Sequence, residues 1–354
     1  MDMLKNHYLR TEEEKENQKN NMAAIQPAQL IQAIKDAIQE SGYSSILVSP
    51  ERSHPRKFII TTPTEAEVPV WVYAWTLTPG GRPQLEHEYR IQMTTVTSPL
   101  EMNPFGPTVL IGYEPSLNMF AGLDLGRHRT FTTGSPSVQI DIRTIRKAIQ
   151  DGLSFDRKNN GEIAVGIRPD QFVQYVMNAK SLHKAGFSIP TFHLLEKAAS
   201  LQVIPTRDIA ILSTERKRTV QMVNRISRAA NFRQQVLRAY GFRCAVTQMQ
   251  LRLIDAAHIL PVQAPGSVDD VRNGIALSPT YHRAYDNGLI YLNESYIMKI
   301  NPSKERELAS LRLDGGLEAF KNSLNKIILP PDKNQWPHVP LIQKANNFRG
   351  IPVK

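Results

Sequence analysis

Apolar and polar residues alternate with two different periods in the first two hundred residues. Between residues 27 and 41 the apolar side chains recur at helical spacing, and Gly42 follows as a helix terminator. Short apolar runs bounded by Pro and Gly come next, which is typical of strands. We predict strands at residues 45–48, 57–61, 68–75, 87–96, 108–113, 117–125, 138–142 and 162–167.

Helical patterns close this region at residues 143–152, 169–179 and 190–201. The fold class we predict is therefore α+β, with a mainly antiparallel β domain and helices over residues 23–201. Residues 1–22 are polar and charged, and we expect them to form a disordered extension. The remaining residues, 202–354, form the second predicted domain.

The second domain contains a strand, a polar loop, a strand and a helix in close succession. The first strand covers residues 253–259, the second 274–277, and a helix over 279–286 opens at the plausible N-cap Ser278. On that helix His282 and Asp286 are four residues apart, so both lie on one face and can bind one cation. Flanking hairpins are predicted at 242–254 and 289–300, a helix at 317–327, and an extended tail from residue 330.

This stretch resembles the HNH (ββα-metal) endonuclease family, in its restriction-endonuclease branch. The resemblance is carried by three segments in order: DAAHI at 255–259, DVRNGIAL at 270–277 and HRAYDNGL at 282–289. A lead-in segment, FRQQVLRAYGFRCAVT at 232–247, extends it to roughly residues 225–292. The N-terminal domain resembles no family that we identify.

The resemblance implies a role for each matching residue. His258 matches the general base that takes a proton from water, and Asn273 matches the residue that fixes the loop aiming the base. His282 matches the metal-binding histidine, and Asp286 stands where a second ligand often occurs. Ala257 departs from the family, which often has a metal-binding Asp or His there, so Asp255, on the same strand face, is the candidate substitute.

The cofactor implied is a divalent metal ion, with Mg²⁺ favoured and Mn²⁺ or another transition metal as alternatives. Many proteins of this family carry paired CxxC motifs that bind zinc. Cys244 is the single cysteine here, and Thr247 stands where the second cysteine of such a motif would be. We therefore expect no structural zinc and a small buried cysteine. Taken singly, a His near a strand end is usually structural and a His/Asp pair on a helix is usually solvated. Only the order and spacing of all three segments favour nuclease chemistry.

Charge is distributed unevenly along the chain. The net charge is +10, and residues 201–354 carry 22 Lys and Arg against 12 Asp and Glu. Such a surface favours a polyanionic partner, which we expect to be double-stranded DNA. The candidate phosphate-binding residues are Arg272, Arg283, Arg243, Arg252 and Arg233, although Arg272 and Arg283 could equally form plain salt bridges.

The aromatic residues of the N-terminal domain allow two interpretations. Trp71, Tyr73, Trp75 and Tyr89 could form a base-stacking pocket, but aromatics at alternate strand positions more often belong to a core. From its architecture we expect the domain at residues 23–201 to act as a target-recognition or sensor module.

Together these features predict a metal-dependent DNA endonuclease of restriction or defence type that leaves 5′ phosphate and 3′ hydroxyl ends. Two alternatives stay open: a signal-gated HNH effector whose N-terminal domain binds a small molecule or protein, and a non-catalytic DNA-binding protein with a degenerate finger. We expect a homodimer, because cutting both strands usually needs two centres. No apolar run is long enough to span a membrane, and no secretory signal is recognisable, so we expect a soluble cytoplasmic protein.

Overall fold

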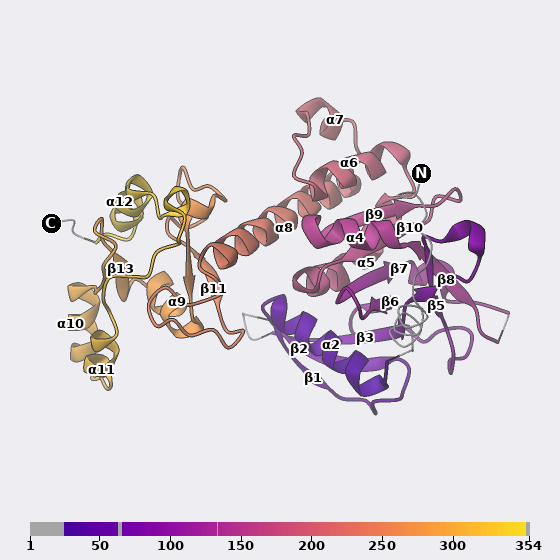
Figure 1. The fold of residues 1–354 in the computed structure, drawn as a ribbon, viewed down its shortest axis with the longest axis horizontal. Coiled ribbons are helices and arrows are strands. Elements are labelled where there is room, and N and C mark those ends of the chain that lie inside the picture. Colours follow the sequence, from indigo (N-terminus) through magenta and orange to yellow (C-terminus); the bar gives the residue numbers. More distant parts are fainter. Residues whose placement is uncertain (1–24, 63–65, 133, 352–354) are drawn as a thin grey trace, which may run out of the picture. The chain divides into compact units, whose positions relative to one another are not determined.

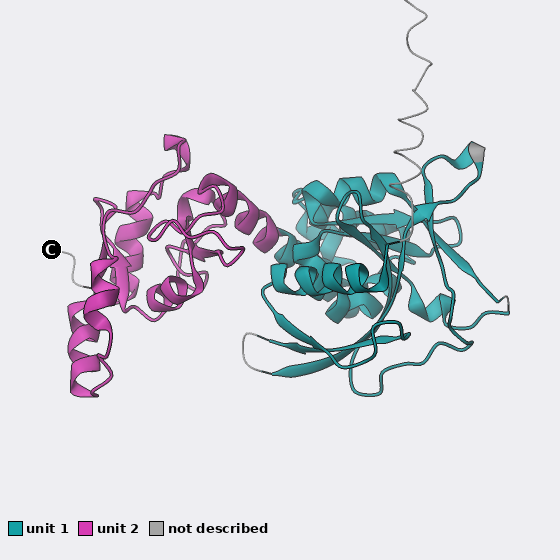
Figure 2. Ribbon diagram, turned by 60° about the horizontal axis from the view of Figure 1, so that its bottom comes forward, with its two compact units in different colours: residues 1–227 teal, residues 228–354 magenta. Residues whose placement is uncertain are grey.

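The structure, a computed structural model, describes residues 25–62, 66–132 and 134–351. The chain divides into two compact units, residues 1–227 and 228–354, which Figure 2 shows in separate colours. The predicted extension at 1–22 lies outside the described residues. The predicted limit at 201/202 stays a prediction, and the limit between the compact units falls inside a long helix, α8 (Thr214–Ala239).

The first unit is built on one large sheet, which has seven strands within the described residues. Its strands, in spatial order, are β1 (Ser44–Leu47), β2 (Arg56–Thr61), β3 (Glu67–Thr76), β6 (Thr108–Glu114), β7 (Met119–Leu123), β10 (Ile163–Ile167) and β9 (Leu153–Arg157). Only the β3–β6 pair is parallel among these pairings, and the others are antiparallel. The predicted α+β class with a mainly antiparallel N-terminal sheet is confirmed. The sequence did not predict β9, because its sequence, LSFDR, is short and directly follows a helix.

Helices and a second sheet bury both faces of this sheet (Figure 1). One apolar core joins it to α2 (Pro27–Glu40), α5 (Phe172–Ala185), α6 (Ile189–Ala199) and the first half of α8. A separate core lies under α4 (Ile142–Asp151) and a small sheet of β4 (Thr78–Pro79), β5 (Glu88–Gln92) and β8 (Ser137–Asp141). The remaining short helices are η1 (Pro83–Leu85), α3 (Leu125–His128), η2 (Pro169–Gln171) and α7 (Thr206–Ala210).

The second unit has its own apolar core, formed around the predicted strand–loop–strand–helix segment. Strand β11 (Asp255–His258) pairs antiparallel with β12 (Gly274–Leu277), and helix α9 (Pro279–Asp286) follows. The other elements are η3 (Val271–Asn273), β13 (Ile290–Leu292), β14 (Met298–Ile300), α10 (Pro302–Ser310), α11 (Leu317–Asn322), η4 (Lys333–Gln335) and α12 (Val339–Phe348). The predicted finger and the hairpin that follows it are both present.

Three predictions for this unit are wrong. Residues 242–254 form successive turns instead of a hairpin, because Phe242, Gln248, Leu251 and Arg252 adopt positive φ angles that extended strands do not allow. The helix predicted to reach residue 327 ends at Asn322. The tail is not extended throughout, since α12 buries Leu341, Ile342 and Ala345 at helical spacing.

Candidate active site

Strands β11 and β12 and helix α9 place the predicted site residues on one small scaffold. Asp255 opens β11 and His258 ends it, opposite Gly274 in the register. Asn273 lies immediately before β12, and α9 carries His282 and Asp286. Gly274 allows α8 to approach, because a Cβ at this position would lie 2.1 Å from Cγ2 of Val236. The register and the tight helix contact together fix where His258 points.

His258 is held between an aromatic ring and a carboxylate. Its ring stacks on Phe232 with centroids 3.8 Å apart and an interplanar angle of 13°. Nε2 lies 3.1 Å from Oδ1 of Asp269, whose other oxygen lies 3.9 Å from Nε of Arg228. Because a carboxylate only accepts, Nε2 carries the proton in this contact. Nδ1 has no hydrogen-bond partner within the described part of the chain, so it is open to a water molecule.

Burial lowers the pKa of His258. Desolvation, the largest influence, lowers the pKa of His258 below its usual value, whereas the charges of Asp269 and Asp286 act in the opposite direction. The net effect is a lowered pKa, which favours the neutral imidazole at neutral pH. A neutral imidazole with one free nitrogen is the form that a general base needs.

Asn273 is fully buried and connects the start of β12 to the loop after β11. Its amide nitrogen donates to the carbonyl oxygen of Val268 at 2.9 Å and of Leu260 at 3.2 Å, and to Oγ of Ser267 at 3.3 Å. Its Oδ1 accepts from the backbone N–H of Leu260 at 2.9 Å. The side chain thus fixes both ends of the loop that carries Asp269 towards His258.

His282 lies between two carboxylates, one at each ring nitrogen. Nδ1 is 3.3 Å from Oδ2 of Asp255, and Nε2 is 3.3 Å from Oδ2 of Asp286. Burial alone would lower the pKa of His282, but the hydrogen bond with Asp255 and the charges of both aspartates outweigh it, so the pKa is raised. The two carboxylates therefore favour a positive charge at this imidazole, either a bound proton or a cation in its place.

The donor set around His282 fits a divalent metal ion. An imidazole nitrogen and a carboxylate oxygen bound to one ion, each at about 2.0–2.2 Å, lie about 3 Å apart, close to the spacing of either pair. The two nitrogens point away from each other, so one ion at His282 has Asp255 or Asp286 beside it. Within residues 25–351, apart from the gaps at 63–65 and 133, no cluster of three such side chains is arranged around one ion. Mg²⁺ commonly uses one or two protein ligands, with water and phosphate completing its shell.

The five predicted phosphate-binding arginines have different surroundings. Arg272 forms an ion pair with Asp270, with Nε 3.1 Å from Oδ1. Arg233 and Arg243 each lie 3.4 Å from a carbonyl oxygen, those of Ile254 and Gln248. Arg283, Arg243 and Arg252 are exposed. Arg272 therefore shares its charge with Asp270.

Three contacting residues were not singled out from the sequence. The sequence places Asp269 only in the polar loop, Phe232 only in the lead-in segment, and Arg228 only among the basic residues of 201–354. The folding of the loop around Asn273 brings Asp269 to His258, and no local spacing encodes that contact. An aromatic residue in the lead-in helix was the one available signal for Phe232.

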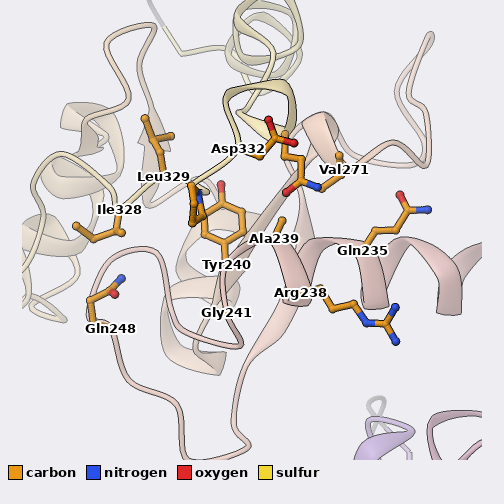
Figure 3. Close-up of a pocket in the computed structure, with 12 residues that line it drawn as sticks. Gln235, Arg238, Ala239, Tyr240, Gly241, Gln248, Val271, Ile328, Leu329 and Asp332 are labelled. Atoms are coloured by element: carbon orange, nitrogen blue, oxygen red, sulfur yellow. The ribbon is translucent and has the colours of Figure 1, made fainter.

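A cavity of about 620 Å³ in the second unit lies away from these residues. Figure 3 shows Tyr240 at the centre of its lining, with Gln235 and Arg238 on the helix beside it. The hydroxyl of Tyr240 is buried and has no hydrogen-bond partner in the described structure. None of the predicted catalytic or metal-binding residues lines this cavity.

Comparison with known families identifies the class of the second unit. The HNH endonuclease family matches residues 244–293, which include β11, β12 and α9. Residues 244–293 therefore form an HNH endonuclease domain, a phosphodiesterase, and the resemblance seen in the sequence is confirmed.

The remaining comparisons concern the first unit and the whole chain. The Methylase-associated X1 family matches residues 68–176, where the sequence revealed no family. A solved structure, "Modification dependent TagI restriction endonuclease", is 12% identical, with 84% of this chain and 86% of that chain covered and a TM-score of 0.29. No curated protein matches the chain. Among the described residues, no helix is both long and apolar enough to cross a membrane.

Proposed function

We propose that this protein is a metal-dependent DNA endonuclease of restriction or defence type, with His258 as its general base. The observation that carries the proposal is the placement of His258 within an HNH finger. Its ring is fixed by Phe232, its Nε2–H donates to Asp269, and its Nδ1 is open. A base oriented by a carboxylate on one nitrogen can accept a proton on the other.

The residues of the chain perform separate tasks in this reaction. Nδ1 of His258 takes a proton from water as the water oxygen attacks phosphorus, and Asp269 stabilises the imidazolium that results. The bond to the 3′ oxygen breaks, and that oxygen takes a proton from solvent, which leaves 5′ phosphate and 3′ hydroxyl ends. His282 with Asp255 or Asp286 would hold the divalent ion, which offsets negative charge on the phosphate and leaving oxygens. Asn273 keeps the loop that aims His258 in place.

The basic second half supports DNA as the substrate. The excess charge of +10 lies entirely in residues 201–354, and Arg283, Arg243 and Arg252 are exposed there. Arginines at a surface bind phosphates without reading the sequence. The methylase association in the name of the family matched at 68–176 supports a restriction-type role. Cutting both strands would be served by a homodimer that brings two such sites together.

Incubation of the purified full chain with plasmid DNA tests the proposal. We expect nicked or linear products with Mg²⁺ or Mn²⁺ and none with chelator, and DNA ligase should reseal the nicks because it requires 5′ phosphate and 3′ hydroxyl ends. Methylated and unmethylated plasmids compared in parallel show whether base modification matters. Equal cleavage in chelator would contradict the metal requirement, and metal-independent DNA binding without cleavage would favour the degenerate-finger alternative. Cleavage that requires a third component would favour the signal-gated alternative.

A further inference from the structure

A second site lies in the first unit, in a cavity of about 640 Å³. It is lined by the start of α2, by β2 and β3, and by the segment around β5, with Arg56 and Trp75 among its walls. We propose that this cavity binds a planar nucleobase-type ring, as a nucleotide or as a base everted from DNA, with Arg56 and Trp75 as its main contacts. The site is separate from the HNH finger, and its test does not rest on catalysis.

Arg56 is the first reason to expect a ligand here. Its side chain is buried, with 4% of the residue exposed, and no carboxylate of the described residues lies within ion-pair distance. Nη1 donates to the carbonyl oxygen of Ala74 at 3.0 Å and lies 3.4 Å from Nδ1 of His54, whereas Nε has no hydrogen-bond partner among the residues that the structure describes. A buried guanidinium without a counter-charge is costly, and burial lowers the pKa of Arg56 accordingly. A ligand with acceptor atoms or negative charge would remove this cost.

Trp75 supplies the second orphaned group. Its indole N–H is buried and has no hydrogen-bond partner within the described residues. The two unsatisfied groups, Trp75 Nε1 and Arg56 Nε, belong to residues that line this cavity and are both donors, so the missing partner is an acceptor. Nucleobase edges and phosphate groups are rich in acceptors, and arginine matches such acceptors with paired N–H groups.

Two stacked rings, those of His54 and Trp75, line the site, and Tyr73 lies behind them in the core. His54 stacks on Trp75 with centroids 4.3 Å apart and planes 10° apart, and Tyr73 lies parallel to both. Burial and the charge of Arg56 lower the pKa of His54 to about 3, so this imidazole is neutral and adds no competing charge. Flat aromatic walls with a guanidinium beside them are the surroundings in which proteins bind bases.

The structure separates these rings from the other aromatics of the first unit. Tyr73 is 2% exposed and donates to the carbonyl oxygen of Glu101, so it belongs to the core. Trp71 lies under Nζ of Lys57 and does not line the cavity. Trp75 does line it, together with Thr76, Thr78, Gln92 and Thr94. The volume lies within the range of about 300–1,000 Å³ typical of small-ligand sites.

Binding measurements on the full chain test the site, in a His258→Ala background so that DNA stays intact. The probes are the eight common ribo- and deoxyribonucleoside 5′-monophosphates by calorimetry, and duplexes containing 2-aminopurine, whose fluorescence changes when the base leaves the stack. The variants are Arg56→Met and Trp75→Leu. Matched controls are Lys57→Met, one residue from Arg56 on β2, and Trp71→Leu on the same strand as Trp75.

We expect Arg56→Met and Trp75→Leu each to weaken binding by about tenfold or more, which corresponds to one lost base stack or charged contact. The controls should bind like the parent. Saturable binding of a free nucleotide identifies a small ligand, and a fluorescence change with DNA alone identifies an everted base. Without ligand, Arg56→Met should melt at the same or a higher temperature, because it removes an unpaired buried charge. The site is refuted if no probe binds the parent, or if both variants bind as tightly as their controls.

Discussion

At the scale of single residues, the contact between His258 and Asp269 decides how the proposed base works. A general base must be held at the right tautomer and orientation, and Asp269 does both through Nε2. Phe232 supplies the remaining constraint by stacking on the ring. The sequence indicates the base but not these two supports, because they come from a loop and a helix that only the folded chain brings together.

Asp269→Asn tests this support. The amide keeps the size of the side chain and loses the charge that stabilises the imidazolium, so kcat should fall on the order of 10- to 100-fold with little change in KM. Asp269 raises the pKa of His258 against burial, and its removal should move the acidic limb of the pH–rate profile to lower pH. Asp270→Asn is the matched control, since Asp270 pairs with Arg272. Equal rates for both variants would exclude the role of Asp269.

Asp255→Ala tests the metal site. Loss of the carboxylate 3.3 Å from Nδ1 of His282 should raise the Mg²⁺ concentration for half-maximal cleavage, on the order of 10- to 100-fold. Asp286→Ala, compared in parallel, shows which nitrogen of His282 faces the ion. An unchanged metal requirement in Asp255→Ala would remove Asp255 from the site and leave the pair His282 and Asp286.

At the scale of elements, the local pattern predicts the finger well and its surroundings poorly. β11, β12 and α9 follow directly from a strand pattern, a Gly and Pro279 at a helix start. The prediction of a hairpin at residues 242–254 is wrong because the hydrophobic pattern does not reveal left-handed conformations at four non-glycine residues. The prediction of an extended tail is wrong because the prolines suggest extended chain, whereas Leu341, Ile342 and Ala345 recur at helical spacing. Pro340 stands in the first turn of α12, where proline is tolerated.

Gly274→Ala tests how α8 positions the finger. The added Cβ would lie 2.1 Å from Val236 Cγ2 and 3.2 Å from the ring of Phe232, on which His258 stacks. The strand and helix must separate, which should destabilise the second unit by about 1–3 kcal/mol and lower kcat. Gly315→Ala is the control, because a Cβ there meets no atom within 4 Å. Thermal denaturation and cleavage rates measure both effects, and matching values for the two variants would contradict this packing.

Glu162 should make the stability of the first unit depend on pH. Burial alone would raise its pKa, but His128 at 2.8 Å and Lys158 at 3.1 Å lower the pKa to about 2. A lowered folded-state pKa adds stability above the unfolded value near 4.5, and that stability is lost as pH falls towards 2. The loss should be about 2–3 kcal/mol in the free energy of unfolding.

Denaturant titrations from pH 6 to pH 3 measure this loss. Trp71 and Trp75 report on the first unit in a Trp336→Phe background, and Glu162→Gln is the comparison. We expect the unfolding midpoint of the parent to fall more steeply with acid than that of Glu162→Gln. Parallel curves would show that Glu162 does not supply the pH dependence.

At the scale of the whole molecule, the sequence separates a neutral first part from a basic second part more clearly than it defines the first fold. The charge excess in residues 201–354 needs only counting. The sheet order of the first unit depends on the parallel pairing of β3 with β6 across more than thirty residues, and no local period encodes such a pairing. Arg56 likewise reaches the carbonyl oxygen of Ala74, and His54 reaches the ring of Trp75, only through the register of β2 on β3.

The most direct test of the central claim is cleavage of plasmid DNA by His258→Ala beside the wild type, at equal metal and protein concentrations. The account predicts that His258→Ala loses cleavage, by about 100-fold or more, because the proton acceptor for water is gone. DNA binding, measured by fluorescence anisotropy, should be unchanged, because the arginines that neutralise phosphate remain. Cleavage by His258→Ala at the wild-type rate would contradict the assignment of the base.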